Sequence, residues 1–279
     1  MKNTLTFAIT FLLLGGLKAQ DKQFAQTYQS TNLAQGFRDL EIWSTVRMGK
    51  EAFYRGIDER LEFEIGLNDR LQTSLYLNAT HQSFATRGDS TGTITSVSDF
   101  SISSEWKLKL TDATTQTIGS AVYGELGISG TGLELEAKLI LDKRIDKHLI
   151  AFNIAGEWEW EQEVKGKVIN GKVEQENKMK LMATPIEFNL GYMYNIRPSF
   201  GLGFEAKNQY EITTEKGLEH AALLLGPTLF FNSKDKEYKL ILNFLPEITN
   251  LRKTDEQPNS LDLDEYEKYQ FRLLLDFEF

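Results

Sequence analysis

The chain of 279 residues contains no cysteine, only five prolines and only three histidines. Without cysteine it has no disulfide, no thiolate metal site and no attachment point for a lipoprotein anchor. The histidines, His81, His148 and His220, are far apart in the sequence and lack the close spacing of a zinc site. The sequence therefore predicts no cofactor.

Basic residues are scarce relative to acidic ones. There are 31 Lys and Arg against 40 Asp and Glu, a net charge of −9, and loss of an N-terminal segment carrying Lys2 and Lys18 would leave −11. Nucleic-acid-binding proteins present basic patches, so we expect no nucleic-acid partner. The glycine-rich stretch 127–132 lies at a turn between predicted strands with no helix after it, which excludes a phosphate-binding loop.

No apolar run reaches the ~18 residues of a membrane-spanning helix. The longest apolar segment, Phe7 to Leu17, follows Lys2 and precedes the small residue Ala19. This arrangement predicts a signal peptide over residues 1–19, cleaved near Ala19 or Gln20. Residues 20–35 are rich in Gln, Ser, Thr and Asn, which predicts a flexible periplasmic lead-in.

The remaining residues, 36–279, contain twelve segments with the alternating pattern of β-strands. They are 38–48, 57–67, 71–84, 97–110, 116–129, 132–142, 148–162, 180–195, 200–213, 220–231, 238–248 and 267–279. Most exceed the ~9–11 residues with which a tilted strand crosses a bilayer. The mean hydropathy of −0.35 agrees with such a barrel, because half of each strand faces a polar interior.

One strand illustrates the alternation. In 57–67, Leu61, Phe63 and Ile65 point to one face, whereas Glu62 and Glu64 point to the other. Aliphatic or aromatic side chains occupy one face of most other segments in the same way. A soluble β-sandwich also alternates, but it does not explain apolar faces this deep on nearly every strand.

The lengths of the links give a second indication. The three long links, 85–96, 163–179 and 249–266, all follow odd-numbered strands, and the links after even-numbered strands are short. Outer-membrane barrels have short periplasmic turns and longer outer loops. Asn170-Gly171 within the second long link predicts a hairpin tip.

The final strand carries the most specific motif. Tyr269, Phe271, Phe277 and Phe279 share one face, and Leu274 is the only apolar residue on the other. This strand resembles the C-terminal strand of bacterial outer-membrane β-barrels. The resemblance implies a Gram-negative outer membrane, contact with its lipids, and recognition of these four aromatic residues by the barrel assembly machinery.

Two further stretches, Gly36 to Trp43 and Arg60 to Leu67, resemble an uncharacterised family of Gram-negative outer-membrane barrels, which offers no established activity. The signal peptide ending in Ala19-Gln20 is similar to those of Bacteroidota. We therefore expect an all-β protein, a twelve-stranded antiparallel transmembrane up-and-down β-barrel over 36–279. The oligomeric state stays open.

The inward faces of these strands suggest a function. A barrel of twelve strands encloses more space than eight, so a passive, porin-like channel for small solutes is expected. The lumen residues that would set its selectivity are Glu62, Glu64, Glu105, Lys107, Glu134, Glu136, Lys138 and Arg272. Alternatively, these charges pair across strands and the barrel is a plugged structural or surface-binding protein.

Two weaker motifs remain. His81-Gln82-Ser83 is similar to the His-x-Ser pair of twelve-stranded outer-membrane phospholipases, which implies a lipid hydrolase, but no Asn stands on the neighbouring strands to orient the imidazole. In the loop 249–266, Asp262, Asp264 and Glu265 are candidates for binding a divalent cation or lipopolysaccharide. The loop lacks EF-hand spacing, and a solvated acidic loop is the alternative.

Overall fold

The computed structural model describes residues 22–85, 92–169, 172–233, 237–253 and 258–279, so the predicted signal peptide and its cleavage site lie outside the described residues. Thirteen antiparallel strands make up the sheet. They are β1 (Arg38–Met48), β2 (Tyr54–Asn68), β3 (Leu71–Ala85), β4 (Ile94–Thr111), β5 (Gly119–Ser129), β6 (Gly132–Ile145), β7 (His148–Ile169), β8 (Lys172–Ala183), β9 (Ile186–Arg197), β10 (Phe200–Thr213), β11 (Gly217–Asn232), β12 (Tyr238–Asn250) and β13 (Tyr269–Glu278).

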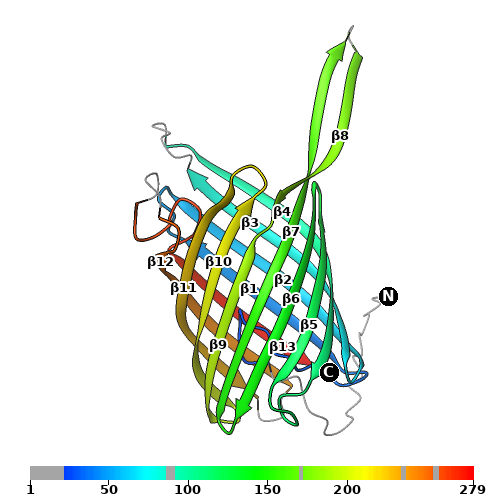
Figure 1. The fold of residues 1–279 in the computed structure, drawn as a ribbon, viewed down its shortest axis with the longest axis vertical. Coiled ribbons are helices and arrows are strands. Elements are labelled where there is room, and N and C mark those ends of the chain that lie inside the picture. Colours follow the sequence, from blue (N-terminus) through cyan, green and yellow to red (C-terminus); the bar gives the residue numbers. More distant parts are fainter. Residues whose placement is uncertain (1–21, 86–91, 170–171, 234–236, 254–257) are drawn as a thin grey trace, which may run out of the picture.

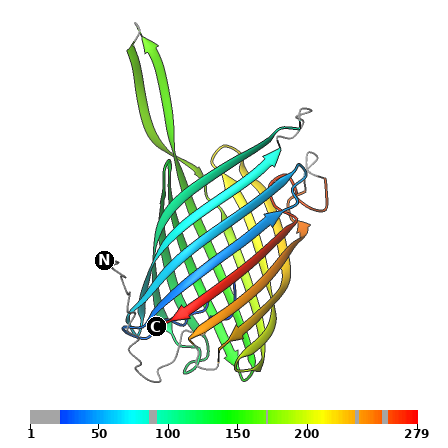
Figure 2. The ribbon, with the colours of Figure 1, turned by 180° about the vertical axis from the view of Figure 1, so that it is seen from behind.

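The sheet closes on itself. Most strands pair with their neighbours in the sequence, and β13 pairs with β1 from Asp39–Glu278 to Met48–Tyr269. The tilted strands form one closed wall (Figures 1 and 2). Closure leaves no free sheet edge in the wall, which a barrel in lipid requires.

Strands β8 and β9 together occupy one position in the wall, so the barrel is twelve-stranded, as predicted. β7 pairs with β9 over His148–Gly156 and with β8 from Glu159 onward. The interruption falls at Thr184 and Pro185, where proline lacks the N–H needed for a continuous ladder.

The link predicted at 163–179 is largely strand, because β7 and β8 continue past the wall as a paired hairpin (Figure 1). Its predicted tip, Asn170-Gly171, lies outside the described residues.

Side chains alternate between the lumen and the outer surface as the sequence predicts. On the outer face, Phe100 is 71% exposed and Leu75 is 52% exposed, whereas Tyr76 and Glu105 on the inner face are fully buried. Apolar side chains cover the outer face of every part of the wall. A continuous apolar belt of this kind matches the hydrocarbon core of a bilayer. Within the described residues, no helix is long and apolar enough to cross a membrane.

The N-terminal segment lies inside the barrel. Residues 22–35, here called the plug segment, form no strand, and Phe24, Ala25, Ser30 and Leu33 are almost fully buried. The prediction of a flexible periplasmic lead-in is wrong for these residues. Their polar composition suits the polar lumen, whose side chains bind the plug backbone.

Candidate functional site

Glu205 on β10 anchors the middle of the plug segment. The backbone N–H groups of Ala25, Gln26 and Thr27 donate to its carboxylate at 3.0, 2.7 and 2.7 Å. Thr228 Oγ1 donates to the same carboxylate at 2.9 Å. Glu205 is fully buried. Hydrogen bonds to a buried carboxylate are stronger than those between neutral groups, so Glu205 fixes these three plug residues.

Other lumen side chains bind the rest of the plug backbone. Asn153 accepts a hydrogen bond from the Tyr28 N–H at 2.6 Å and donates to the Tyr28 carbonyl at 3.0 Å. Asp142 accepts from the Ser30 N–H at 2.9 Å. The plug therefore satisfies its buried backbone groups through the barrel wall instead of through a β-ladder.

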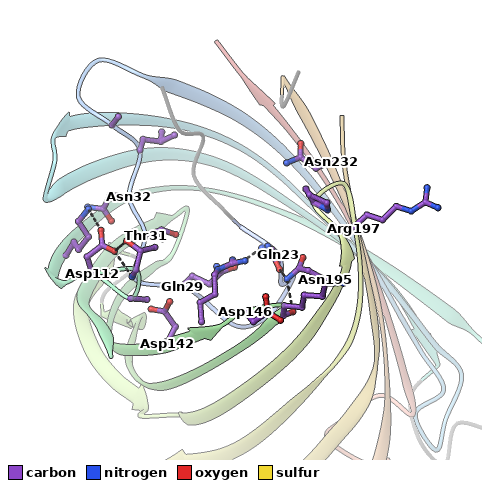
Figure 3. A pocket seen from close by; sticks show the side chains of 18 of the residues that line it. Gln23, Gln29, Thr31, Asn32, Asp112, Asp142, Asp146, Asn195, Arg197 and Asn232 are labelled. Atoms are coloured by element: carbon purple, nitrogen blue, oxygen red, sulfur yellow. Dashed lines mark hydrogen bonds and ion pairs between the residues drawn. The ribbon is translucent and has the colours of Figure 1, made fainter. Parts of the chain in front are cut away.

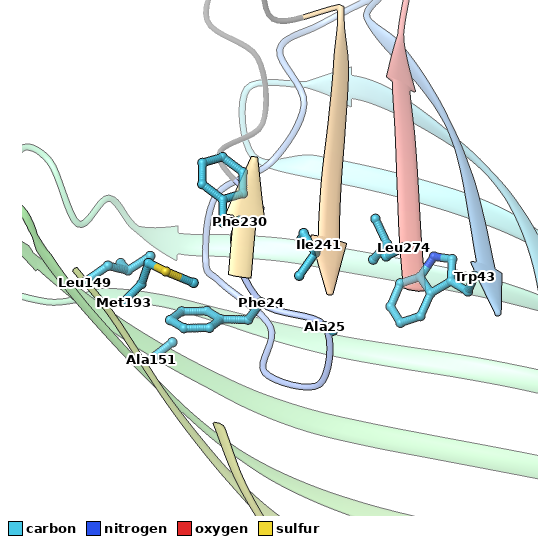
Figure 4. Packing of buried hydrophobic residues seen from close by; sticks show 9 residues of the cluster. All are labelled: Phe24, Ala25, Trp43, Leu149, Ala151, Met193, Phe230, Ile241 and Leu274. Carbon is cyan, nitrogen blue, oxygen red and sulfur yellow. The ribbon is translucent and has the colours of Figure 1, made fainter. Parts of the chain in front are cut away.

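Phe24 packs into an apolar patch on the inner wall (Figure 4). The patch consists of Trp43, Leu149, Ala151, Met193, Phe230, Ile241 and Leu274, with Ala25 beside Phe24. Leu274, the one apolar residue on the polar face of the last strand, thus belongs to the same cluster as the plug residues. Apolar side chains facing a lumen are stabilised when an aromatic ring covers them.

Two glycines of the wall make room for the plug. A Cβ at Gly191 would lie 2.8 Å from Phe24 Cε1, and a Cβ at Gly66 would lie 2.2 Å from the Ala34 carbonyl oxygen. No other residue fits at these positions without moving the plug. The shape of the inner wall is therefore complementary to the plug segment.

Lys22 holds the beginning of the described plug. Its ammonium lies 2.5 Å from Glu41 Oε2 and 4.4 Å from the centre of the Trp43 ring. Burial lowers the pKa of Lys22, but Glu41, Glu62 and Glu64 outweigh burial and raise that pKa well above its usual value. Lys22 therefore stays charged at neutral pH and attracts the plug to the carboxylates of the wall.

The plug divides the lumen into two spaces. The inner cavity, about 770 Å³, is lined by plug residues Gln23, Gln29 and Thr31 and by the short turns between strands, including Asp146 and Pro198 (Figure 3). The outer vestibule, about 350 Å³, has Gln26 and Tyr28 at the plug surface. Plug residues line both spaces, so the plug lies between them.

Acidic residues outnumber basic ones in the outer vestibule. Its lining includes seven acids against four bases, namely Asp58, Glu59, Glu125, Glu134, Glu136, Glu157 and Glu187 against Arg60, Lys138, Lys207 and Arg272. Some of these pair, with Lys138 at 2.9 Å from Glu136 and Lys207 at 2.8 Å from Glu187. The surplus of carboxylates makes this space attractive to cations.

The structure places all eight predicted lumen residues inside the barrel. Glu62, Glu64, Glu105 and Lys107 are buried near the plug. Glu134, Glu136, Lys138 and Arg272 line the outer vestibule. Arg272 also donates to the carbonyl of Ala25 at 2.9 Å, so it contacts the plug as well.

The structure gives the weaker candidates the following partners and positions. His81 Nδ1 hydrogen-bonds to Ser98 Oγ at 2.9 Å, and Ser83 Oγ hydrogen-bonds to Ser96 Oγ at 2.9 Å, so each has a partner on β4. The acid Asp262 is buried and hydrogen-bonds to His220 Nδ1 at 2.8 Å.

Asp264 and Glu265, in contrast, are exposed, and among the described residues they join no group of three metal-binding side chains. The predicted assembly signal, Tyr269, Phe271, Phe277 and Phe279, lies on the outer face of the wall.

Comparison with known proteins identifies one family and several barrels. Residues 17–279 match a family described as a family of unknown function, DUF6662. No curated protein has a matching sequence.

Among solved structures, the chain is similar to the β domain of the Bordetella autotransporter BrkA (TM-score 0.59, 10% identity, 88% of this chain and 100% of that one). It is also similar to the NanC porin (TM-score 0.49, 13% identity, 85% and 98%). At 10% identity, the likeness to the autotransporter β domain concerns the fold alone.

Proposed function

We propose that this chain, which belongs to the DUF6662 family, is an outer-membrane channel for small solutes that its own plug segment closes. The observation that carries the proposal is the pair of cavities, about 770 Å³ and about 350 Å³, that are both lined in part by plug residues. Removing the plug would join them into one passage.

The plug is able to leave without damage to the wall. Its residues 22–35 belong to no strand, whereas closure of the barrel depends on the pairing of β1 with β13. Lumen carboxylates such as Glu205 would then be solvated by water instead of being left without partners. Plug release therefore costs local contacts and not the β-ladder.

The proposal includes the location of the protein. The apolar outer face supports residence in the outer membrane of a Gram-negative bacterium, in contact with its lipids. A source among the Bacteroidota rests on the likeness of the signal peptide and stays a prediction. Recognition of the C-terminal strand by the assembly machinery is a further proposal, tested below.

Single-channel conductance in planar bilayers tests the proposal. We expect the full-length protein to be closed most of the time and a variant lacking residues 22–33 to conduct in stable steps. Glu134→Gln, which alters the vestibule without touching the plug, is the matched control and should stay closed. If the deletion variant migrates as a folded barrel on unheated gels yet never conducts, the lumen is closed by the wall itself and the plugged structural alternative stands.

Ion selectivity tests the role of the vestibule. The seven-to-four surplus of acids predicts a preference for cations in the plug-deleted channel. Replacing both Glu134 and Glu136 by Lys should reduce or reverse that preference, measured as the reversal potential in a salt gradient. An unchanged reversal potential would show that ions do not pass the vestibule.

A further inference from the structure

A buried cluster of carboxylates surrounds the Lys22 end of the plug. Six carboxylates face three ammonium groups, namely Asp39, Glu41, Glu62, Glu64, Glu105 and Asp276 against Lys22, Lys107 and Lys239. Lys239 lies 2.7 Å from Asp276 and 3.8 Å from Asp39, and Lys22 lies 2.5 Å from Glu41. A buried excess of negative charge is costly unless protons or a cation neutralise it.

Three of these carboxylates converge. Glu41, Glu62 and Glu64 each offer an oxygen, and the three oxygens lie within 4.8 Å of one another. Glu62 is only 1% exposed, and in the described part of the chain neither of its carboxylate oxygens receives a hydrogen bond. A buried carboxylate that receives no hydrogen bond is neutralised either by a proton, which Glu62 would share with Glu64, or by a cation.

The spacing suits a divalent cation. Calcium binds carboxylate oxygens at ~2.3–2.6 Å, so oxygens on opposite sides of one ion are up to ~5 Å apart. Magnesium requires a smaller, nearly ideal octahedron at ~2.0–2.1 Å. Separations of no more than 4.8 Å place the three oxygens close enough together to bind one calcium ion.

We propose that Glu41, Glu62 and Glu64 form a calcium-binding site in the lumen and that the Lys22 ammonium takes the place of the ion when calcium is absent. Lys22 already contacts Glu41 Oε2, one of the oxygens available to the ion, and lies over the Trp43 ring. Calcium and the plug thus compete for one carboxylate. The inference concerns binding and does not depend on the channel being conductive.

Calorimetric titration of calcium into the purified full-length barrel tests the site. We expect saturable binding that Glu62→Gln weakens at least ~10-fold, because a charged ligand is lost. Lys22→Met should strengthen binding by a similar ~10-fold factor, because the competing cation is removed. Glu134→Gln, an acid of the outer vestibule, is the matched control and should leave the affinity unchanged.

Terbium luminescence locates the ion. The Trp43 indole N–H donates to Glu41 Oε2 at 2.7 Å, so a terbium ion at the site should emit when tryptophan is excited. Trp43→Phe should abolish this emission while calcium still binds. Trp158→Phe is the control, because Trp158 is exposed on the outer face.

The calcium affinity is expected to fall in Glu62→Gln and to rise in Lys22→Met. General attraction of calcium to an acidic lumen would not produce these opposite changes. Equal calcium affinities in wild type, Glu62→Gln and Lys22→Met would overturn the proposal, as would the absence of saturable binding in Lys22→Met. In either case protons, and not an ion, neutralise the cluster. Folding of each variant is verified by its mobility on unheated gels.

Discussion

At the scale of single residues, Glu205 is the main contact of the plug. Its carboxylate accepts three backbone N–H groups, whereas a glutamine would offer one oxygen and would turn an N–H₂ group toward donors. Hydrogen bonds to charged groups contribute about 1.5–3 kcal/mol each. We therefore expect Glu205→Gln to speed amide hydrogen exchange at residues 25–27 at least ~10-fold. Glu134→Gln should leave these exchange rates unchanged. Equal rates in both variants would show that Glu205 does not hold the plug backbone in place.

Phe24 and Gly191 provide a second test at this scale. A Cβ at Gly191 would lie 2.8 to 3.0 Å from three atoms of the Phe24 ring. Gly191→Ala should therefore displace the ring and raise the open probability of the channel. Phe24→Ala should open it further, since truncating a buried phenylalanine costs about 3–5 kcal/mol.

The double variant separates steric overlap from general damage to the wall. If the methyl group of Gly191→Ala acts only on the ring, adding it to Phe24→Ala should change nothing more, because the two substitutions remove one contact. An additional rise in open probability in the double variant would mean that Gly191→Ala disturbs the wall itself.

At the scale of elements, the strands follow from the sequence because local chemistry determines them. β1, Arg38–Met48, coincides with its predicted range, and most other strands differ by a few residues at their ends. Residues such as Phe100 and Glu105 face the predicted sides because one side of each strand meets lipid and the other meets the lumen.

The plug could not be predicted in the same way. A run of Gln, Ser, Thr and Asn is typical both of a flexible linker and of a segment whose backbone binds polar lumen side chains. The available signal lay in the wall instead: Leu274, Trp43 and Ile241 are apolar side chains on the lumen face, which a water-filled channel does not need. The plug residues of the same cluster, Phe24 and Ala25, are distant in the sequence, so periodicity alone does not reveal them.

The C-terminal strand permits a prediction about assembly. Phe279 is half exposed on the outer face, exchanges backbone hydrogen bonds with Arg38, and its ring centre lies 6.3 Å from that of Phe63. Phe279→Ala should therefore refold in detergent as the wild type does, yet reach the outer membrane in smaller amounts in cells. Phe100→Ala, another exposed aromatic, is the control. Similar losses in both variants would indicate lipid contact and not recognition of the last strand.

At the scale of the whole molecule, wall and plug are held by different kinds of contact. The wall is held by β-ladders that close through β1 and β13, and the plug is held by side chains that reach inward from several strands. Conditions that weaken the plug should consequently open the lumen before the barrel unfolds. One such condition is a pH that removes the charge of Lys22, because Lys22 binds the wall through its ammonium group.

Alkaline pH should release the plug through Lys22. The folded protein raises the pKa of Lys22 above its usual value of 10.5, so its contribution is complete below that pH and is lost as pH rises through the folded pKa. In calcium-free buffer, the open probability of the wild type should be constant near neutrality and increase above pH 10.5. Lys22→Met should be more open at neutral pH and lack the alkaline increase. If Lys22→Met shows the same increase, another group controls plug release, and Lys22 only neutralises the carboxylates around it.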